Sequence, residues 1–98
     1  APRPYRHGHK VHRLPHGYHR LRYHDDLFYY HHGLFYRPAT LGFVVVHPPI
    51  GIVVTSLPVG YRRIWVGPTA YYFYRGICYQ ETLSGYVVVE PPPEVLIR

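Results

Sequence analysis

The sequence predicts an all-β protein, a small sandwich or barrel of about eight short antiparallel strands with an extended N-terminal arm. Three observations predict this fold. One stretch of the chain occurs twice, tyrosine, phenylalanine and valine dominate both copies, and glycines recur every nine residues from Gly33 to Gly60. Aromatic and β-branched residues favour strands. Turn residues at such a spacing are typical of sandwiches and barrels.

The repeat aligns residues 27–50 with residues 70–93 at an offset of 43, without a gap. The two copies read LFYYHHGLFYRPATLGFVVVHPPI and AYYFYRGICYQETLSGYVVVEPPP. A match at a fixed offset indicates a duplicated supersecondary unit. Each copy predicts a three-stranded meander. The strands are expected at residues 28–31, 34–37 and 42–47, and again at 71–74, 77–80 and 85–90.

The first two strands of each meander flank a residue–glycine pair, His32-Gly33 and Arg75-Gly76. Such a pair suits the positive φ angles of a two-residue hairpin turn. Two more strands are expected between the copies, at residues 51–55 and 61–66, and no helix is expected in residues 25–98. We therefore assign residues 25–93 to one β domain.

The last strand of each copy, residues 43–46 (FVVV) and 86–89 (YVVV), is apolar at every position. A strand of this kind needs both faces covered. The cover is either a second layer of the same body or a neighbouring subunit. Residues 94–98 (EVLIR) form a strand-like tail suited to adding to the edge of another sheet.

Residues 1–24 form a basic arm that contains six of the eleven Lys and Arg residues, six of the nine histidines and no acid. Its prolines, its glycines and its small aliphatic content predict an extended segment without a core. Such a segment is ordered only where it lies against its own body or against another molecule.

The arm histidines are candidate metal ligands, because neutral imidazoles bind zinc, copper and nickel. The candidates are His7, His9, His12, His16 and His19. The alternative is that these imidazoles stack and hydrogen-bond within a basic arm and bind nickel or copper adventitiously. We predict no cofactor.

The arm also interleaves its cations with tyrosines, which favours non-specific binding to anionic polymers such as DNA or acidic polysaccharide. No motif of a sequence-specific nucleic-acid-binding fold accompanies it. Serine occurs only at Ser56 and Ser84, and no nucleophile, base and orienting acid are grouped together. We predict that the protein is not an enzyme.

The single cysteine, Cys78, is either a buried small hydrophobe or an intermolecular thiol. No apolar run reaches the roughly 20 residues of a membrane-spanning helix. The small residue at position 1 fits cleavage of a signal peptide, and removal of an initiator methionine fits equally.

The motif Tyr-Tyr-x-x-x-Gly-x-x-Tyr, followed by Gly-Tyr-Val-Val-Val-x-Pro-Pro, resembles a family of small secreted bacterial cell-envelope domains rich in Tyr, Gly, Pro and Val. A Leu-Pro-x-Gly-Tyr-Arg-Arg segment lies between the copies, and the resemblance spans about residues 28–93, leaving the arm outside. It implies export to the extracellular space or the cell surface and a β fold.

These observations predict a self-assembling exported protein, the subunit of an extracellular filament or matrix fibre. The alternatives are an envelope module that binds metal through the arm histidines, and an adhesin for anionic polymers. The partner is the protein itself. The predicted assembly interface consists of Tyr5, Val11, Leu14, Tyr18, Leu21, Tyr23, Val45, Val88, Val95, Leu96 and Ile97, with Cys78 as the candidate intermolecular thiol.

Overall fold

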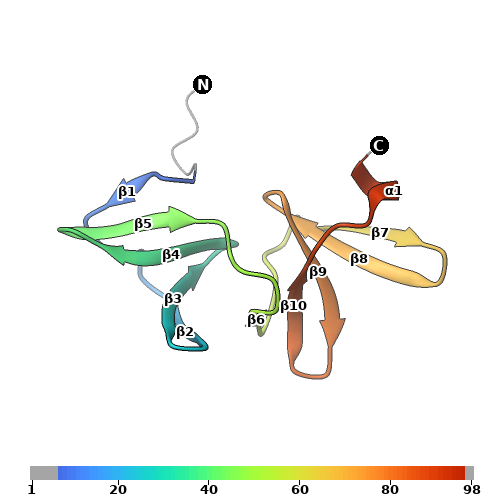
Figure 1. Cartoon of the computed structure of the whole chain (residues 1–98), viewed down its shortest axis with the longest axis horizontal. Helices are drawn as coiled ribbons and strands as arrows, with labels where there is room; N and C mark the ends of the chain where they lie inside the picture. Colours follow the sequence, from blue (N-terminus) through green and yellow to red (C-terminus); the bar gives the residue numbers. More distant parts are fainter. Residues whose placement is uncertain (1–6, 97–98) are drawn as a thin grey trace. The chain divides into compact units, whose positions relative to one another are not determined.

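The computed structural model describes residues 7–96, which contain ten short strands and one short helix. The chain divides into two compact units, residues 1–47 (unit 1) and 48–98 (unit 2), each with one open five-stranded sheet (Figure 1). All strand pairs are antiparallel, and neither sheet closes into a barrel. The predicted all-β class is confirmed.

Unit 1 contains a meander of four strands with a fifth strand added at one edge. The spatial order is β1-β5-β4-β3-β2. The strands are β1 (Lys10–Val11), β2 (His19–Tyr23), β3 (Asp26–His31), β4 (Leu34–Ala39) and β5 (Gly42–Val46).

Unit 2 repeats this arrangement in the order β6-β10-β9-β8-β7. Its strands are β6 (Val53–Val54), β7 (Arg62–Val66), β8 (Thr69–Tyr74), β9 (Ile77–Thr82) and β10 (Gly85–Val89). Every strand begins 43 residues after its counterpart in unit 1.

The predicted arm is therefore not a separate segment, because it supplies β1 and β2 to the sheet of unit 1. Residues 8–20 (GHKVHRLPHGYHR) align with residues 51–63 (GIVVTSLPVGYRR) at the same offset of 43. The hydrogen bonds repeat too: the Gly8 N–H donates to Val45 O at 2.7 Å, and the Gly51 N–H donates to Val88 O at 2.8 Å. The duplicated unit is a whole five-stranded sheet, and the predicted boundary at residue 25 lies inside unit 1.

The predicted hairpin turns are present in both units. The φ angles are 46° and 83° at His32 and Gly33, and 51° and 78° at Arg75 and Gly76. Two successive positive φ angles are typical of the turn that matches the twist of its flanking strands.

Gly42 and Gly85 allow a close backbone approach at the start of β5 and β10. A Cβ atom on Gly42 would overlap the carbonyl oxygen of Val11, and one on Gly85 would overlap that of Val54. Both glycines also have positive φ angles, 154° and 137°. Only glycine allows β1 and β6 to pair this closely with β5 and β10.

Unit 1 buries side chains on both faces of its sheet. On one face Leu34, Tyr36 and Val45 are buried, and Val11, Leu14, Tyr29 and Phe43 pack against them. Phe28, Tyr30 and Phe35 are buried on the opposite face. Unit 2 buries the counterpart residues Val54, Ile77, Tyr79 and Val88. Burying one aliphatic side chain of this kind contributes roughly 1.5–3 kcal/mol. The arm residues Val11 and Leu14 thus contribute to the core of their own unit.

The C-terminal segment is helical, which corrects the predicted strand-like tail and the prediction that residues 25–98 contain no helix. Residues Pro93–Leu96 form the single turn α1, in which the Val95 N–H donates to Pro92 O at 3.0 Å. Proline fits the first helical position because its missing N–H needs no partner there, and Glu94 is favourable in the first turn. No helix in residues 7–96 has the length and hydrophobicity needed to cross a bilayer.

Candidate functional site

The candidate metal ligands are distributed over unit 1. The rings of His7 and His47 meet edge to face with centroids 5.2 Å apart, and His12 Nδ1 lies 3.3 Å from Leu41 O. His19 lies on β2. In the described part of the chain, no three His, Cys, Asp or Glu side chains are grouped to hold a metal ion.

Four residues of the predicted assembly interface pack within their own unit. Val11 and Leu14 pack on the core, and Val45 and Val88 are each 1% exposed. Tyr18, Leu21 and Tyr23 lie on β2 or next to it, Val95 lies on α1, and Leu96 ends α1; Tyr5 and Ile97 lie outside the described residues.

Cys78 is buried, with 3% of its surface exposed. Burial raises the pKa of its thiol to about 11, because an apolar environment disfavours the thiolate. Of the two predicted roles, this environment suits a buried small hydrophobe, since a reactive thiol needs exposure and a lowered pKa.

Two exposed positions outside the turns are identical in the two units. They are Tyr18 and Arg20 in unit 1, and Tyr61 and Arg63 in unit 2. Tyr18 is 46% exposed and Tyr61 is 41% exposed. Most other residues that the repeats share are buried, half-buried or at turns, so packing explains them. These two pairs point to a surface with a function in both units.

Each exposed tyrosine is the outer member of a row of three aromatic rings. In unit 1 the ring centroids are 5.5 Å apart from Tyr18 to Tyr29 and 5.2 Å apart from Tyr29 to Phe43. The corresponding distances are 5.6 Å from Tyr61 to Tyr72 and 5.3 Å from Tyr72 to Tyr86 in unit 2. The contact is edge to face for Tyr18 and tilted for Tyr61, and it holds each exposed ring at a defined place.

The central tyrosine of each row is the cross-strand partner of an arginine, Arg20 for Tyr29 and Arg63 for Tyr72. Directly paired residues point to the same face of a sheet, so the arginine lies beside the row of rings. Arg22 follows Arg20 by two residues on β2, and Trp65 follows Arg63 by two residues on β7; both side chains are exposed.

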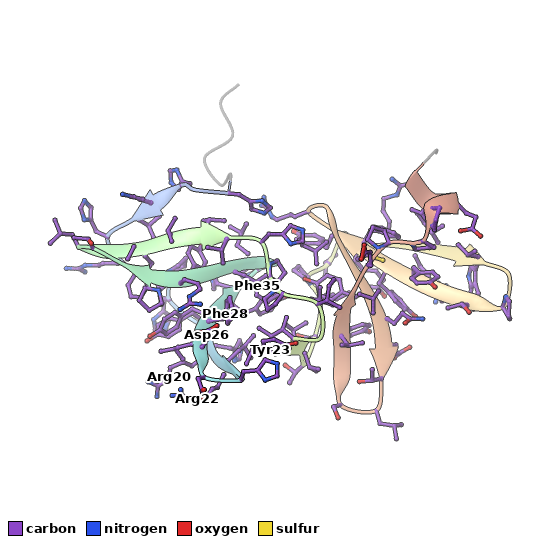
Figure 2. The ribbon with its side chains drawn as sticks, in the orientation of Figure 1. Arg20, Arg22, Tyr23, Asp26, Phe28 and Phe35 are labelled. Atoms are coloured by element: carbon purple, nitrogen blue, oxygen red, sulfur yellow. The ribbon has the colours of Figure 1, made fainter. Side chains whose placement is uncertain are left out.

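We call these exposed side chains the edge surface: Tyr18, Arg20 and Arg22 in unit 1, and Tyr61, Arg63 and Trp65 in unit 2. Arg20 and Arg22 lie close together at the lower end of unit 1 in the view of Figure 2. The guanidinium carbon of Arg63 lies 5.9 Å from the centre of the Trp65 ring, a cation–π arrangement. Each unit thus presents ring surface and fixed positive charge side by side.

Sequence reasoning found Tyr18 as an interface residue but missed Arg20, Tyr61, Arg63 and Trp65 as parts of a site. The signal was present, since Leu-Pro-x-Gly-Tyr-x-Arg occurs at residues 14–20 and 57–63. The histidines and cations around the first copy make it look unlike the second.

Comparison with known families extends the sequence match over the arm. A family model described as a family of unknown function (DUF6515) matches residues 2–98, beyond the span of about 28–93 that the motifs suggested. Searches of curated proteins and of solved structures found no match. With nearly its whole length matched, the chain belongs to this family of unknown function, DUF6515.

Proposed function

We propose that this protein is an exported adhesive module that binds acidic polysaccharide through the edge surface of its two units. The observation that supports the proposal most is the retention of Tyr18 and Arg20 as Tyr61 and Arg63, at exposed positions of both repeats. Export is part of the proposal and is supported by the resemblance to secreted envelope domains.

The chemistry of the edge surface suits a sugar polymer with carboxylates. A guanidinium forms paired hydrogen bonds with a carboxylate, and a tyrosine ring offers flat apolar surface to a sugar ring. In unit 2 the arginine of the edge surface stands between two rings, Tyr61 and Trp65, whereas in unit 1 two neighbouring arginines follow one ring. The spacing in unit 2 matches a polymer whose charges are separated by uncharged surface better than the closely spaced phosphates of nucleic acid.

Two copies of the surface on one chain also favour a polymer over a single sugar. Once one unit has bound, the other meets the same polymer at a raised effective concentration. A net charge of +6 adds a general attraction to polyanions that weakens with salt.

The test is binding of a polyuronate to the full chain in low and moderate salt, measured by calorimetry. We expect Arg20→Gln or Arg63→Gln to weaken binding about threefold to tenfold each, and the double variant to weaken it more than either single variant. Single-stranded DNA serves as the competitor of similar charge, and we expect it to bind more weakly.

The matched control is the double variant R13Q/R75Q. It removes one exposed arginine from each unit, outside the edge surface. The proposal fails if R20Q/R63Q weakens binding no more than R13Q/R75Q does. In that case the attraction is a property of net charge alone, and the edge arginines serve to prevent edge-to-edge pairing of sheets.

Self-assembly is the second candidate. It is favoured by the open edge strands β2 and β7 and by the exposure of Trp65, 55%. The order of the arm does not favour self-assembly, because β1 and β2 lie in the sheet of unit 1 and need no neighbouring subunit to order them. Sedimentation velocity over a wide concentration range tests it, and a single monomeric species throughout would exclude it.

A further inference from the structure

A groove with a volume of about 560 Å³ lies entirely within unit 2. β7, β8, the β8–β9 turn and α1 line it, and Figure 1 shows α1 beside β7. This size is within the range of small-molecule sites. The lining residues are Gly60, Arg62, Ile64, Phe73, Tyr74, Arg75, Gly76 and Val95.

The groove and the edge surface lie on opposite faces of β7. Arg62 pairs with Phe73, and both line the groove, whereas Arg63 pairs with Tyr72 on the other face. Neighbouring residues of a strand point to opposite faces. A ligand in the groove therefore meets side chains that the edge surface does not use.

Among the described residues that line the groove, the charged side chains are Arg62 and Arg75, and none is a carboxylate. The guanidinium carbon of Arg75 lies 5.8 Å from the centre of the Tyr74 ring, which restricts where this cation points. Two arginines that line a partly apolar groove suit an anionic group, which guanidinium binds with paired hydrogen bonds.

The remaining walls are apolar. Ile64, Phe73 and Val95 are half-buried and face the groove with hydrocarbon and ring surface. Gly76 adds no side chain, and a Cβ atom at this position would meet nothing within 4 Å. The groove thus has room for an apolar body next to the two cations.

Unit 1 shows that the fold does not need these arginines. The counterparts of Arg62, Tyr74 and Arg75 are His19, His31 and His32, and the same strands and the same turn form there.

The rings of His31 and His32 lie 4.4 Å apart in unit 1. Burial, followed by the nearby His32 and His19, lowers the pKa of His31, while a hydrogen bond with the His16 backbone opposes this shift.

We infer that the groove of unit 2 is a binding site for a small amphiphilic carboxylate, a molecule with one carboxylate on an apolar or aromatic body. Arg62 and Arg75 bind the carboxylate, and the body packs against Phe73, Ile64 and Val95. The site is separate from the proposed polysaccharide surface and does not depend on it.

The probe is phenylpropionate, added to the full chain at neutral pH and followed by the backbone amide shifts of residues 60–76. We expect saturable binding centred on these residues. Phenylpropanamide, which lacks the charge, and propionate, which lacks the ring, should each bind at least about tenfold more weakly. Equal binding of the acid and the amide would overturn the inference.

The decisive variant is R62H/R75H, which places at both positions the residue that the corresponding strand and turn of unit 1 contain. We expect it to lose phenylpropionate binding. The matched control is R63Q, which removes a charge from the opposite face of the same strand and should keep the affinity. Equal affinity of R62H/R75H and R63Q would overturn the inference.

The two proposals fail separately in these variants. R62H/R75H should keep most of its polyuronate binding, whereas R20Q/R63Q should lose it while still binding phenylpropionate. If R62H/R75H loses the polymer and keeps phenylpropionate, both assignments are wrong.

Discussion

The two units have the same sheet and different surfaces. Strand order and hairpin turns agree, and Tyr36 and Tyr79 are both 0% exposed. All nine histidines, however, lie in unit 1. At the counterpart positions unit 2 has residues such as Ile52, Arg62 and Glu90.

This difference teaches which residues the fold needs. A position that differs between the units is one that the sheet tolerates, and a buried or turn position that agrees is one that the sheet requires. Agreement at an exposed position, as at Tyr18 and Tyr61, calls for another explanation. The repeat thus separates structural residues from functional ones within a single chain.

The largest effect is expected from emptying either core. Tyr36→Ala and Tyr79→Ala should each lower the free energy of unfolding by about 3–5 kcal/mol, because each removes a fully buried ring. Denaturant unfolding followed by circular dichroism measures both. The control is Leu83→Ala, an exposed residue whose loss should change little. If the two tyrosine variants lose free energies of unfolding that differ by more than about 2 kcal/mol, the cores of the two units are not packed equivalently.

A smaller effect on stability is expected from the titration of Cys78 in unit 2, whose counterpart in unit 1 is Phe35. The pKa of the Cys78 thiol is raised from 9.0 to about 11, so between these values the folded state binds more protons than the unfolded state. The free energy of unfolding should therefore fall as pH rises through this range, by at most about 2–3 kcal/mol.

Cys78→Ala should remove this part of the pH dependence and leave the part due to Tyr86, whose pKa burial and the nearby Glu81 raise. Thiol labelling gives a second readout: native Cys78 should react far more slowly than a thiol introduced by Ser84→Cys at an exposed turn. Equal labelling rates would contradict the buried environment.

The smallest effect concerns one hydrogen bond that only unit 2 can make. The Tyr72 hydroxyl donates to Glu81 Oε1 at 3.3 Å, and the residue at the position of Glu81 in unit 1 is Pro38. Tyr72→Phe should cost about 0.5–1.5 kcal/mol, and Tyr29→Phe less than about 0.5 kcal/mol. Thermal unfolding measures the stability that each variant loses. Equal losses for Tyr72→Phe and Tyr29→Phe would mean that the hydrogen bond to the Glu81 carboxylate does not stabilise unit 2.

Much of the fold could be predicted from local patterns. The hairpin turns at His32-Gly33 and Arg75-Gly76 follow from a residue–glycine pair between aromatic runs. The first half of unit 1 was harder to predict, because β1 has only two residues and the alternation of arginine with Leu21 and Tyr23 in β2 is short. β1 forms because β5, distant in the sequence, offers it a backbone partner, whereas β2 pairs with the next strand, β3, in a hairpin.

The site was harder to predict than the fold. A tyrosine and an arginine two residues apart have no recognisable chemistry until a sheet places a second tyrosine opposite the arginine. The groove likewise needs α1, which the sequence pattern had assigned to a strand. The proline at the start of α1 favours helix, but the apolar run after it masks this signal.

By itself the sequence determined the β class, the repeat offset of 43 and the turns, because these depend on residue type at close spacing. The match of residues 8–20 with residues 51–63 is also in the sequence, but only the tertiary structure decided that this part of the arm supplies β1 and β2 to the sheet of unit 1. It also decided that Val11 and Leu14 pack on the core of unit 1. These facts depend on the pairing of β1 with β5, which is far away in the chain, and local composition carries no record of that pairing.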